Sequence, residues 1–213
     1  MASLELALST TWSDSSPSAR RSEEAPIAKP EYEQIGTQII EDAGGASDPD
    51  PTDAPTTAAT AGAKIKIAAP VCGEIVPLEE LSDEVFASGM LGNGVGIVPN
   101  GGVIHSPVSG TVLNAFRTGH AYGIKTDEGV EVLIHIGVDT VSMKGAGFTA
   151  EVIAGDRVLV GDRIATVDFS KVKDAGYDPT TIILITNTKD VADVIPVGPK
   201  AVKTGEGIIE VQV

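Results

Sequence analysis

The 213-residue sequence contains a single cysteine, Cys72, and few aromatic residues, which make up 4% of the chain. One cysteine excludes a disulfide within the chain, and we expect a reducing, cytoplasmic environment. Because aromatic side chains are scarce, a core must be built mainly from aliphatic ones. No run of about 18 apolar residues is present, so we expect no membrane span. The first residues also lack the basic start and long apolar stretch of a secretory signal.

Basic residues are scarce as well: 15 Lys and Arg stand against 30 Asp and Glu, which gives a net charge of −15. This charge argues against nucleic acid or an anionic membrane surface as a partner, because both are negatively charged. It favours a partner protein with a basic surface.

The composition divides the chain near residue 63. Residues 1–62 carry 11 acidic and 3 basic residues and clusters of Ser, Thr, Ala and Pro, which cannot supply a core. We therefore predict a largely disordered, acidic, low-complexity tail and linker. Within it, residues 31–43 place apolar side chains at helical spacing before two glycines, which predicts a short amphipathic helix. We assign residues 63–213 to one folded domain.

The second part of the chain has short β-branched runs separated by glycine turns, which is the pattern of an all-β protein. We expect two small helices, around residues 82–87 and 169–175. The pattern predicts an antiparallel β-sandwich or barrel of many short strands with one or two short helices. The predicted strands cover residues 65–68, 73–77, 94–99, 102–105, 110–116, a hairpin within 117–140, 148–152, 163–168, 181–185 and 207–213.

Two of the three histidines lie in segment 117–140, which we interpret as a β-hairpin with its turn at Asp127-Glu128-Gly129. If the loop has two or four residues, paired residue numbers sum to 255, and His120 stands opposite His135 on one face. Their β-carbons would then lie roughly 4.5–5.5 Å apart. A three-residue loop would change the sum to 256 and place the histidines on opposite faces. The sequence leaves both registers open.

The second strand of this hairpin has one continuous apolar face, formed by Val132, Ile134, Ile136 and Val138. His135 therefore points away from the most apolar side. In the first strand, Thr118 shares a face with His120, where its hydroxyl could hydrogen-bond a ring nitrogen and fix the tautomer.

A single histidine in an apolar strand more often has a structural role, but an opposed pair permits three chemistries. One imidazole could accept a phosphoryl group while the other donates a hydrogen bond to its oxygens. The pair could bind Zn²⁺, although Asp139 is the only close third ligand and zinc needs three or four. Acid–base hydrolysis lacks a well-placed serine or cysteine nucleophile. Phosphoryl relay requires the fewest additional groups.

Six motifs follow one another in the second part of the chain. They are IAAPVCGEIV at 67–76, SPVSGTV at 106–112, TGHA at 118–121, HIGVDTV at 135–141, KGAGF at 144–148 and GDRVLVGD at 155–162. In this order they strongly resemble the glucose-type IIA component of the bacterial phosphoenolpyruvate-dependent sugar phosphotransferase system. The resemblance covers about residues 64–213, and it implies a β-sandwich phosphocarrier domain.

The resemblance also implies a role for each site residue. His135 would accept a phosphoryl group from the phosphocarrier HPr and pass it to a cysteine of a sugar-permease IIB domain. His120 would stabilise the phosphate, and Thr118 would orient His120. The partner-binding positions of the family correspond here to the acidic residues Asp83 and Asp139 and the apolar residues Val85, Phe86, Leu91 and Val141.

This relay requires no cofactor, and the resemblance implies zinc only where the two histidines share it with a carboxylate of a partner protein. Two other functions remain open. The same face could serve a regulatory binding module that controls permeases or kinases. A zinc-dependent hydrolase is a third hypothesis, against which the absence of a His-x-His motif counts.

Overall fold

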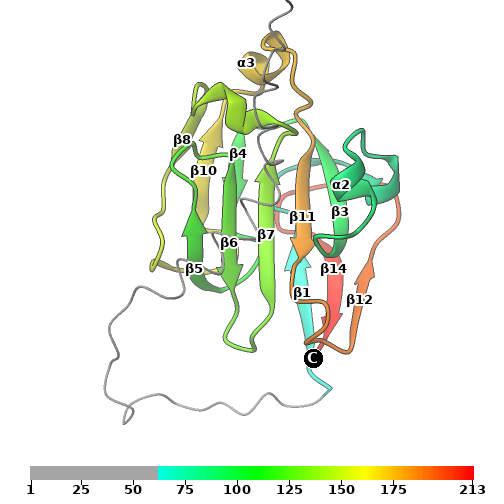
Figure 1. The fold of residues 1–213 in the computed structure, drawn as a ribbon. Helices are drawn as coiled ribbons and strands as arrows, with labels where there is room; N and C mark the ends of the chain where they lie inside the picture. Colours follow the sequence, from blue (N-terminus) through cyan, green and yellow to red (C-terminus); the bar gives the residue numbers. More distant parts are fainter. Residues whose placement is uncertain (1–61) are drawn as a thin grey trace, which may run out of the picture.

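The computed structural model describes residues 62–213, which form three antiparallel β-sheets with two short α-helices (Figure 1). This confirms the predicted all-β class. The predicted acidic tail and its helix at 31–43 lie outside the described residues. Within residues 62–213, none of the helices is long and apolar enough to cross a membrane.

The elements follow the predicted order. The strands are β1 (Lys64–Ala68), β2 (Gly73–Pro77), β3 (Asn93–Pro99), β4 (Val103–His105), β5 (Gly110–Ala115), β6 (Ala121–Lys125), β7 (Glu131–Ile136), β8 (Phe148–Ala150), β9 (Arg157–Val158), β10 (Arg163–Val167), β11 (Thr181–Ile185), β12 (Asp193–Pro196), β13 (Ala201–Val202) and β14 (Gly207–Gln212). The helices are α2 (Glu84–Ala87) and α3 (Phe169–Asp174), with 3₁₀ turns η2 (Leu78–Glu80) and η3 (Thr140–Met143).

Most predicted strands are present with boundaries within two residues of those expected. The sequence pattern missed β9, β12 and β13, which have two to four residues each. Strands this short carry almost no alternation of their own. Each forms because a longer neighbour offers it hydrogen bonds: β5 for β9, β14 for β12 and β2 for β13.

One sheet has eight strands in the order β13-β2-β3-β11-β7-β6-β5-β9, and two smaller sheets contain β1-β14-β12 and β4-β10-β8. The main core lies between one face of the large sheet and both small sheets. It includes Ile67 of β1, Ile104 of β4, Ile134 of β7, Ile164 of β10 and Ile209 of β14. Burial of these aliphatic side chains is the principal stabilising term of the fold.

The opposite face of the large sheet carries a second, smaller apolar cluster, which we call the outer cluster. It is composed of Leu78, Phe86, Ala121, Leu133, Val138, Ile182 and Leu184, with Leu81, Leu91 and Phe116 packed against it. Strand β11 is therefore buried on both faces. Strands β6, β7 and β11 lie side by side at the centre of the sheet (Figure 1).

The alternation of β7 agrees with the prediction up to Ile136 and then changes. Val132, Ile134 and Ile136 face the main core, but Val138 belongs to the outer cluster. Gly137 has a φ of 76°, in the left-handed region, which ends the extended backbone and reverses the side on which Val138 projects. The prediction of one apolar face through Val138 was therefore wrong.

Tyr122 of β6 makes the stability of the fold depend on pH in the alkaline range. The side chain is fully buried in the main core, and its hydroxyl has no hydrogen-bond partner within the described part of the chain. Burial, with a smaller effect from Glu151, raises the pKa of Tyr122 from 10.0 to about 12. The folded state thus favours the neutral phenol, and this stabilisation is present below pH 10 and is lost as the pH rises from 10 to about 12.

We therefore expect the free energy of unfolding to fall between pH 9 and pH 11 by roughly 1 kcal/mol more in the wild type than in Tyr122→Phe. Urea titrations of both proteins at a series of pH values measure this difference. An identical pH dependence in the two proteins would show that Tyr122 does not titrate with an altered pKa.

Candidate functional site

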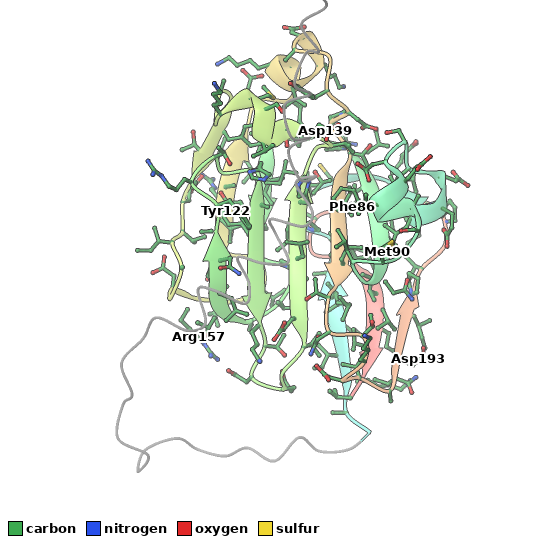
Figure 2. The ribbon with its side chains drawn as sticks, viewed as in Figure 1. Phe86, Met90, Tyr122, Asp139, Arg157 and Asp193 are labelled. Carbon is green, nitrogen blue, oxygen red and sulfur yellow. The ribbon has the colours of Figure 1, made fainter. Side chains whose placement is uncertain are left out.

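Strand β7 places His135 on the outer face of the large sheet. The residue pairs with Ala121 of β6 on one side and with Ile182 of β11 on the other. Its ring packs against Phe86 of α2, with ring centroids 5.1 Å apart. Figure 2 shows Phe86 beside β11 and Asp139 beyond the end of β7. The imidazole is therefore held in an apolar setting by three neighbouring elements.

The backbone of Gly137 fixes the tautomer of His135. Nδ1 of the ring lies 2.8 Å from the Gly137 carbonyl oxygen. Because a carbonyl only accepts hydrogen bonds, Nδ1 carries the proton, and the neutral ring keeps its lone pair on Nε2. The left-handed conformation of Gly137 turns its carbonyl back toward the ring. A β-carbon at this position would lie 2.5 Å from Thr140 Cγ2, so only glycine fits.

His120 lies in the turn between β5 and β6. The Gly119 amide donates a hydrogen bond to the Phe116 carbonyl (2.7 Å), and the Phe116 amide donates one to the Ala121 carbonyl (3.1 Å). The Thr118 hydroxyl is hydrogen-bonded to His120 Nδ1. The His120 ring also packs against Phe116, at a centroid distance of 5.3 Å. The predicted Thr118–His120 contact is present, although it arises from a turn and not from a shared strand face.

The two histidine rings are neighbours. Their centroids lie 5.2 Å apart and their planes are nearly perpendicular, at 81°. Each ring has its Nδ1 engaged by a group of its own: the Gly137 carbonyl for His135 and the Thr118 hydroxyl for His120. Each Nδ1 is thus held by a group only two residues away in the chain.

The register that brings the histidines together differs from the register we expected to do so. Strands β6 and β7 pair Ala121 with His135, a sum of 256, so the register is the alternative under which the two histidines are not directly opposed. The loop has three residues, 127–129, closed by a hydrogen bond from the Gly129 amide to the Thr126 carbonyl (3.1 Å). Gly129 has a φ of 93°, the left-handed conformation that the last residue of a three-residue hairpin loop adopts.

A regular continuation of β6 would direct His120 into the main core, on the side of Tyr122. The chain instead bends at His120, directly after Gly119, whose φ is 69°. This bend brings the ring to the outer face. The inference that a three-residue loop would separate the histidines was therefore also wrong, because His120 lies outside the strand.

The predicted docking residues differ in their environments. Asp83 caps the N-terminus of α2: its Oδ1 accepts hydrogen bonds from the amides of Val85 (2.8 Å) and Phe86 (3.1 Å). Phe86 is only 6% exposed and serves as packing for His135. Val85, Leu91 and Val141 are half-buried. Asp139 is exposed and makes no capping hydrogen bond to η3, which begins directly after it.

Sequence reasoning missed two residues that shape this site. Phe116 is the packing partner of His120, and its position at the end of a strand just before Thr-x-His was an available signal. Asp178 links two loops: its carbonyl accepts the Val138 amide (2.9 Å), and its carboxylate accepts the Thr180 amide (2.8 Å) and the Ser82 hydroxyl (3.4 Å). No pattern in the sequence connects Asp178 with the histidines.

The two imidazoles could supply two of the four ligands that zinc prefers. Within residues 62–213, no group of three or more His, Cys, Asp and Glu side chains is arranged to hold a metal ion.

Comparison with known proteins identifies the family of this fold. Residues 65–191 match the family model of the phosphoenolpyruvate-dependent sugar phosphotransferase system, EIIA 1. The glucose-specific EIIA component of Oceanobacillus iheyensis is 42% identical over 146 residues, which cover 68% of this chain and 88% of that protein. The glucose permease IIA of Mycoplasma capricolum superposes with a TM-score of 0.63 at 41% identity, covering 70% of this chain and 96% of that structure.

A longer relative, the β-glucoside-specific EIIBCA component of Halalkalibacterium halodurans, is 41% identical over 167 residues. The match covers 78% of this chain but only 26% of that protein. Both the matched segment and the fold thus place the described domain among EIIA proteins. The chain belongs to the EIIA 1 family of the phosphoenolpyruvate-dependent sugar phosphotransferase system.

Proposed function

We propose that this domain relays phosphoryl groups during sugar uptake, taking one from phospho-HPr onto His135 and passing it to the cysteine of a IIB permease domain. The observation that carries the proposal is the pair of adjacent rings whose Nδ1 atoms are both held by other groups. Membership of a phosphotransferase family supports it. The fusion of an EIIA part with B and C parts in the H. halodurans relative supports a IIB partner.

His135 Nε2 is the proposed nucleophile, because the Gly137 carbonyl keeps the proton on Nδ1. Its lone pair forms a bond to phosphorus while the bond from phosphorus to the donor's imidazole nitrogen breaks. The electron pair of the broken bond returns to the donor ring. His135 becomes a phosphorylated imidazolium, whose Nδ1–H then donates a charge-assisted hydrogen bond to the Gly137 carbonyl. No proton has to move in this step, which makes it readily reversible.

His120 is the proposed stabilising residue. If the Thr118 hydroxyl donates its hydrogen to Nδ1, the proton of the neutral ring resides on Nε2. Nε2–H can then donate a hydrogen bond to an oxygen of a phosphoryl group on His135, since the two rings lie side by side. Such a donor stabilises the charge on the phosphoryl oxygens during transfer.

Carboxylates near the pair suit a basic partner surface. Asp139 is exposed beyond the end of β7 (Figure 2), and Asp83 lies half-buried at the start of α2. Opposite charges across an interface mainly increase the rate of encounter. We propose that these residues, with Val85, Leu91 and Val141, form the surface on which HPr and the IIB domain dock.

Incubation with phospho-HPr carrying a labelled phosphoryl group tests the proposed function. We expect the wild-type protein to take up the label in an acid-labile, base-stable form, as a phosphorus–nitrogen bond requires. We also expect the label to move on to the cysteine of an added IIB domain. Absence of uptake by the folded wild-type protein would refute the proposal.

Replacement of His120 by alanine separates uptake from onward transfer. We expect His120→Ala to take up the label, because the His135 nucleophile remains, but to pass it on about 10²–10³ times more slowly, since one hydrogen-bond donor to the phosphoryl oxygens is lost. Thr118→Val should slow onward transfer by roughly 10-fold, because no hydroxyl then fixes the tautomer of His120. Thr118→Ser keeps the hydroxyl and should behave like the wild type. Single-turnover transfer to IIB measures all three. A normal rate in His120→Ala would contradict its assignment.

A further inference from the structure

Two Asn-Gly dipeptides lie at the two ends of β3: Asn93-Gly94 begins the strand, and Asn100-Gly101 directly follows it. An asparagine before glycine can lose its side-chain amide without any enzyme, because glycine has no β-carbon to keep its own amide nitrogen away from the asparagine Cγ. The reaction requires a side-chain amide that is not held, a backbone that can rotate, and access to water. The two dipeptides differ in all three respects.

The Asn93 side chain is held at both ends of its amide group. Its Nδ2 donates a hydrogen bond to the Val194 carbonyl (3.3 Å), and its Oδ1 accepts one from the Gly94 amide (2.8 Å). Both residues of the dipeptide belong to β3 and pair with β11. A β-carbon at Gly94 would lie 1.9 Å from the Ile183 carbonyl oxygen, so β11 packs directly against this backbone. Rotation of the Asn93–Gly94 backbone would therefore require β3 to leave the sheet.

Asn100 is exposed in the bend after β3. Its backbone amide donates a hydrogen bond to the Cys72 carbonyl (3.0 Å). Within residues 62–213, no hydrogen bond holds the Asn100 side-chain amide or the Gly101 backbone amide. Rotation here moves only the bend, because the next strand, β4, begins at Val103. The Gly101 nitrogen can therefore approach the Asn100 Cγ without disturbing a sheet.

A polar hollow of about 330 Å³ lies beside this bend. It is roughly ten times larger than the volume that one water molecule occupies in the liquid, about 30 Å³. Water therefore reaches the Asn100 amide from the hollow, and the side chain has room to change its rotamer. The polar and glycine residues that border the hollow are Asn100, Gly101, Gly102, Asp168, Ser170 and Lys173.

We propose that Asn100 is a site of spontaneous deamidation in the folded protein, whereas the sheet protects Asn93. The Gly101 nitrogen gives its proton to hydroxide and forms a bond to the Asn100 Cγ. The bond from Cγ to the side-chain nitrogen breaks, and this nitrogen takes a proton from water and leaves as ammonia. One water molecule then opens the resulting succinimide ring at either carbonyl, which gives aspartate or isoaspartate. In total, one water is consumed, one ammonia is released and one negative charge is added.

The modification changes the bend in two ways. Isoaspartate directs the main chain through the former side-chain carbon, so the connection between β3 and β4 becomes longer by one carbon atom. The new carboxylate also borders the hollow that Lys173 borders, where the opposite charges attract each other. An isoaspartate at this position is exposed, and it would be a substrate for a protein carboxyl methyltransferase that acts on isoaspartyl residues.

Timed incubation of the full-length protein followed by tryptic digestion tests the inference. Cleavage after Lys66 and Arg117 leaves both dipeptides in one peptide, so tandem mass spectrometry compares their deamidation within the same molecule. We expect Asn100 to deamidate at least about 10-fold faster than Asn93. When the protein is unfolded in urea, the two rates should agree within about 3-fold, because β11 no longer restrains Asn93. A smaller ratio in the folded protein would overturn the inference.

The pH and two variants provide further measurements. The rate at Asn100 should rise about 10-fold per pH unit, because deprotonation of the weakly acidic Gly101 N–H increases in proportion to hydroxide. Isoaspartate, measured as labelled methyl groups that a purified isoaspartyl methyltransferase transfers, should fall at least about 10-fold in Asn100→Gln, because glutamine would have to form a larger ring. Asn93→Gln is the matched control and should resemble the wild type. Undiminished methylation of Asn100→Gln would show that another residue is modified.

Discussion

His135→Ala is expected to abolish phosphoryl uptake from phospho-HPr, by at least about 10³-fold in rate. The substitution removes the Nε2 lone pair, and the neighbouring His120 does not replace it if Thr118 keeps the proton of that ring on Nε2. Acid-labile label bound to the protein after incubation with phospho-HPr measures the effect. This is the largest functional loss we expect for any single substitution.

The control for this variant is His105→Ala. His105 is the third histidine of the chain, and its Nδ1 lies 3.3 Å from the Pro70 carbonyl, far along the chain from the pair. The His105→Ala variant should take up label at the wild-type rate. Because His135 is buried, circular dichroism must show that His135→Ala is folded. Undiminished labelling of the folded variant would mean that another residue accepts the phosphoryl group.

Gly137→Ala is expected to reduce the free energy of unfolding by about 2–5 kcal/mol. The left-handed φ of 76° costs a non-glycine residue roughly 1–2 kcal/mol. The added β-carbon would also lie 2.5 Å from Thr140 Cγ2 and 2.9 Å from the Asp178 carbonyl oxygen, and such overpacking typically costs a further 1–3 kcal/mol. Urea unfolding of the variant and the wild type measures the loss.

The same change should slow phosphoryl uptake by roughly 10-fold, because the Gly137 carbonyl that holds His135 Nδ1–H is displaced. Gly155→Ala separates the two sources of destabilisation. Gly155 has a φ of 92°, but nothing lies within 4 Å of a β-carbon there, so this variant should lose only the 1–2 kcal/mol of backbone strain and should keep its phosphoryl uptake. Equal losses of stability in the two variants would show that crowding at Gly137 has no effect.

Much of the fold was predictable because β-strands and turns leave local signals. The long strands β7 and β11 are dense in β-branched residues, and glycines mark most of the chain reversals. The short strand β9 was not predictable, because two residues have no pattern and depend on β5 for their hydrogen bonds. At 127–129, Gly129 indicated a turn in the sequence. Its place as the third loop residue, which the sequence did not show, decided the register of β6 and β7.

The candidate site residues were chosen from the sequence on a geometry that differs from the observed one. His120, His135 and Thr118 were singled out on the assumption of an opposed strand pair, and the observed register excludes that pairing. The contacts that actually fix the rings come from residues distant in the chain or from main-chain atoms. Phe86 packs against His135 from α2, Phe116 packs against His120, and the Gly137 carbonyl binds Nδ1.

The sequence by itself determined the all-β class, the positions of most strands and the family, because each of these is recorded in local composition, alternation or motif. The tertiary structure alone decided that the rings meet and which nitrogen of His135 carries the proton. The physical reason is that these two properties depend on left-handed backbone at Gly119 and Gly137, which leaves no periodic trace in the sequence.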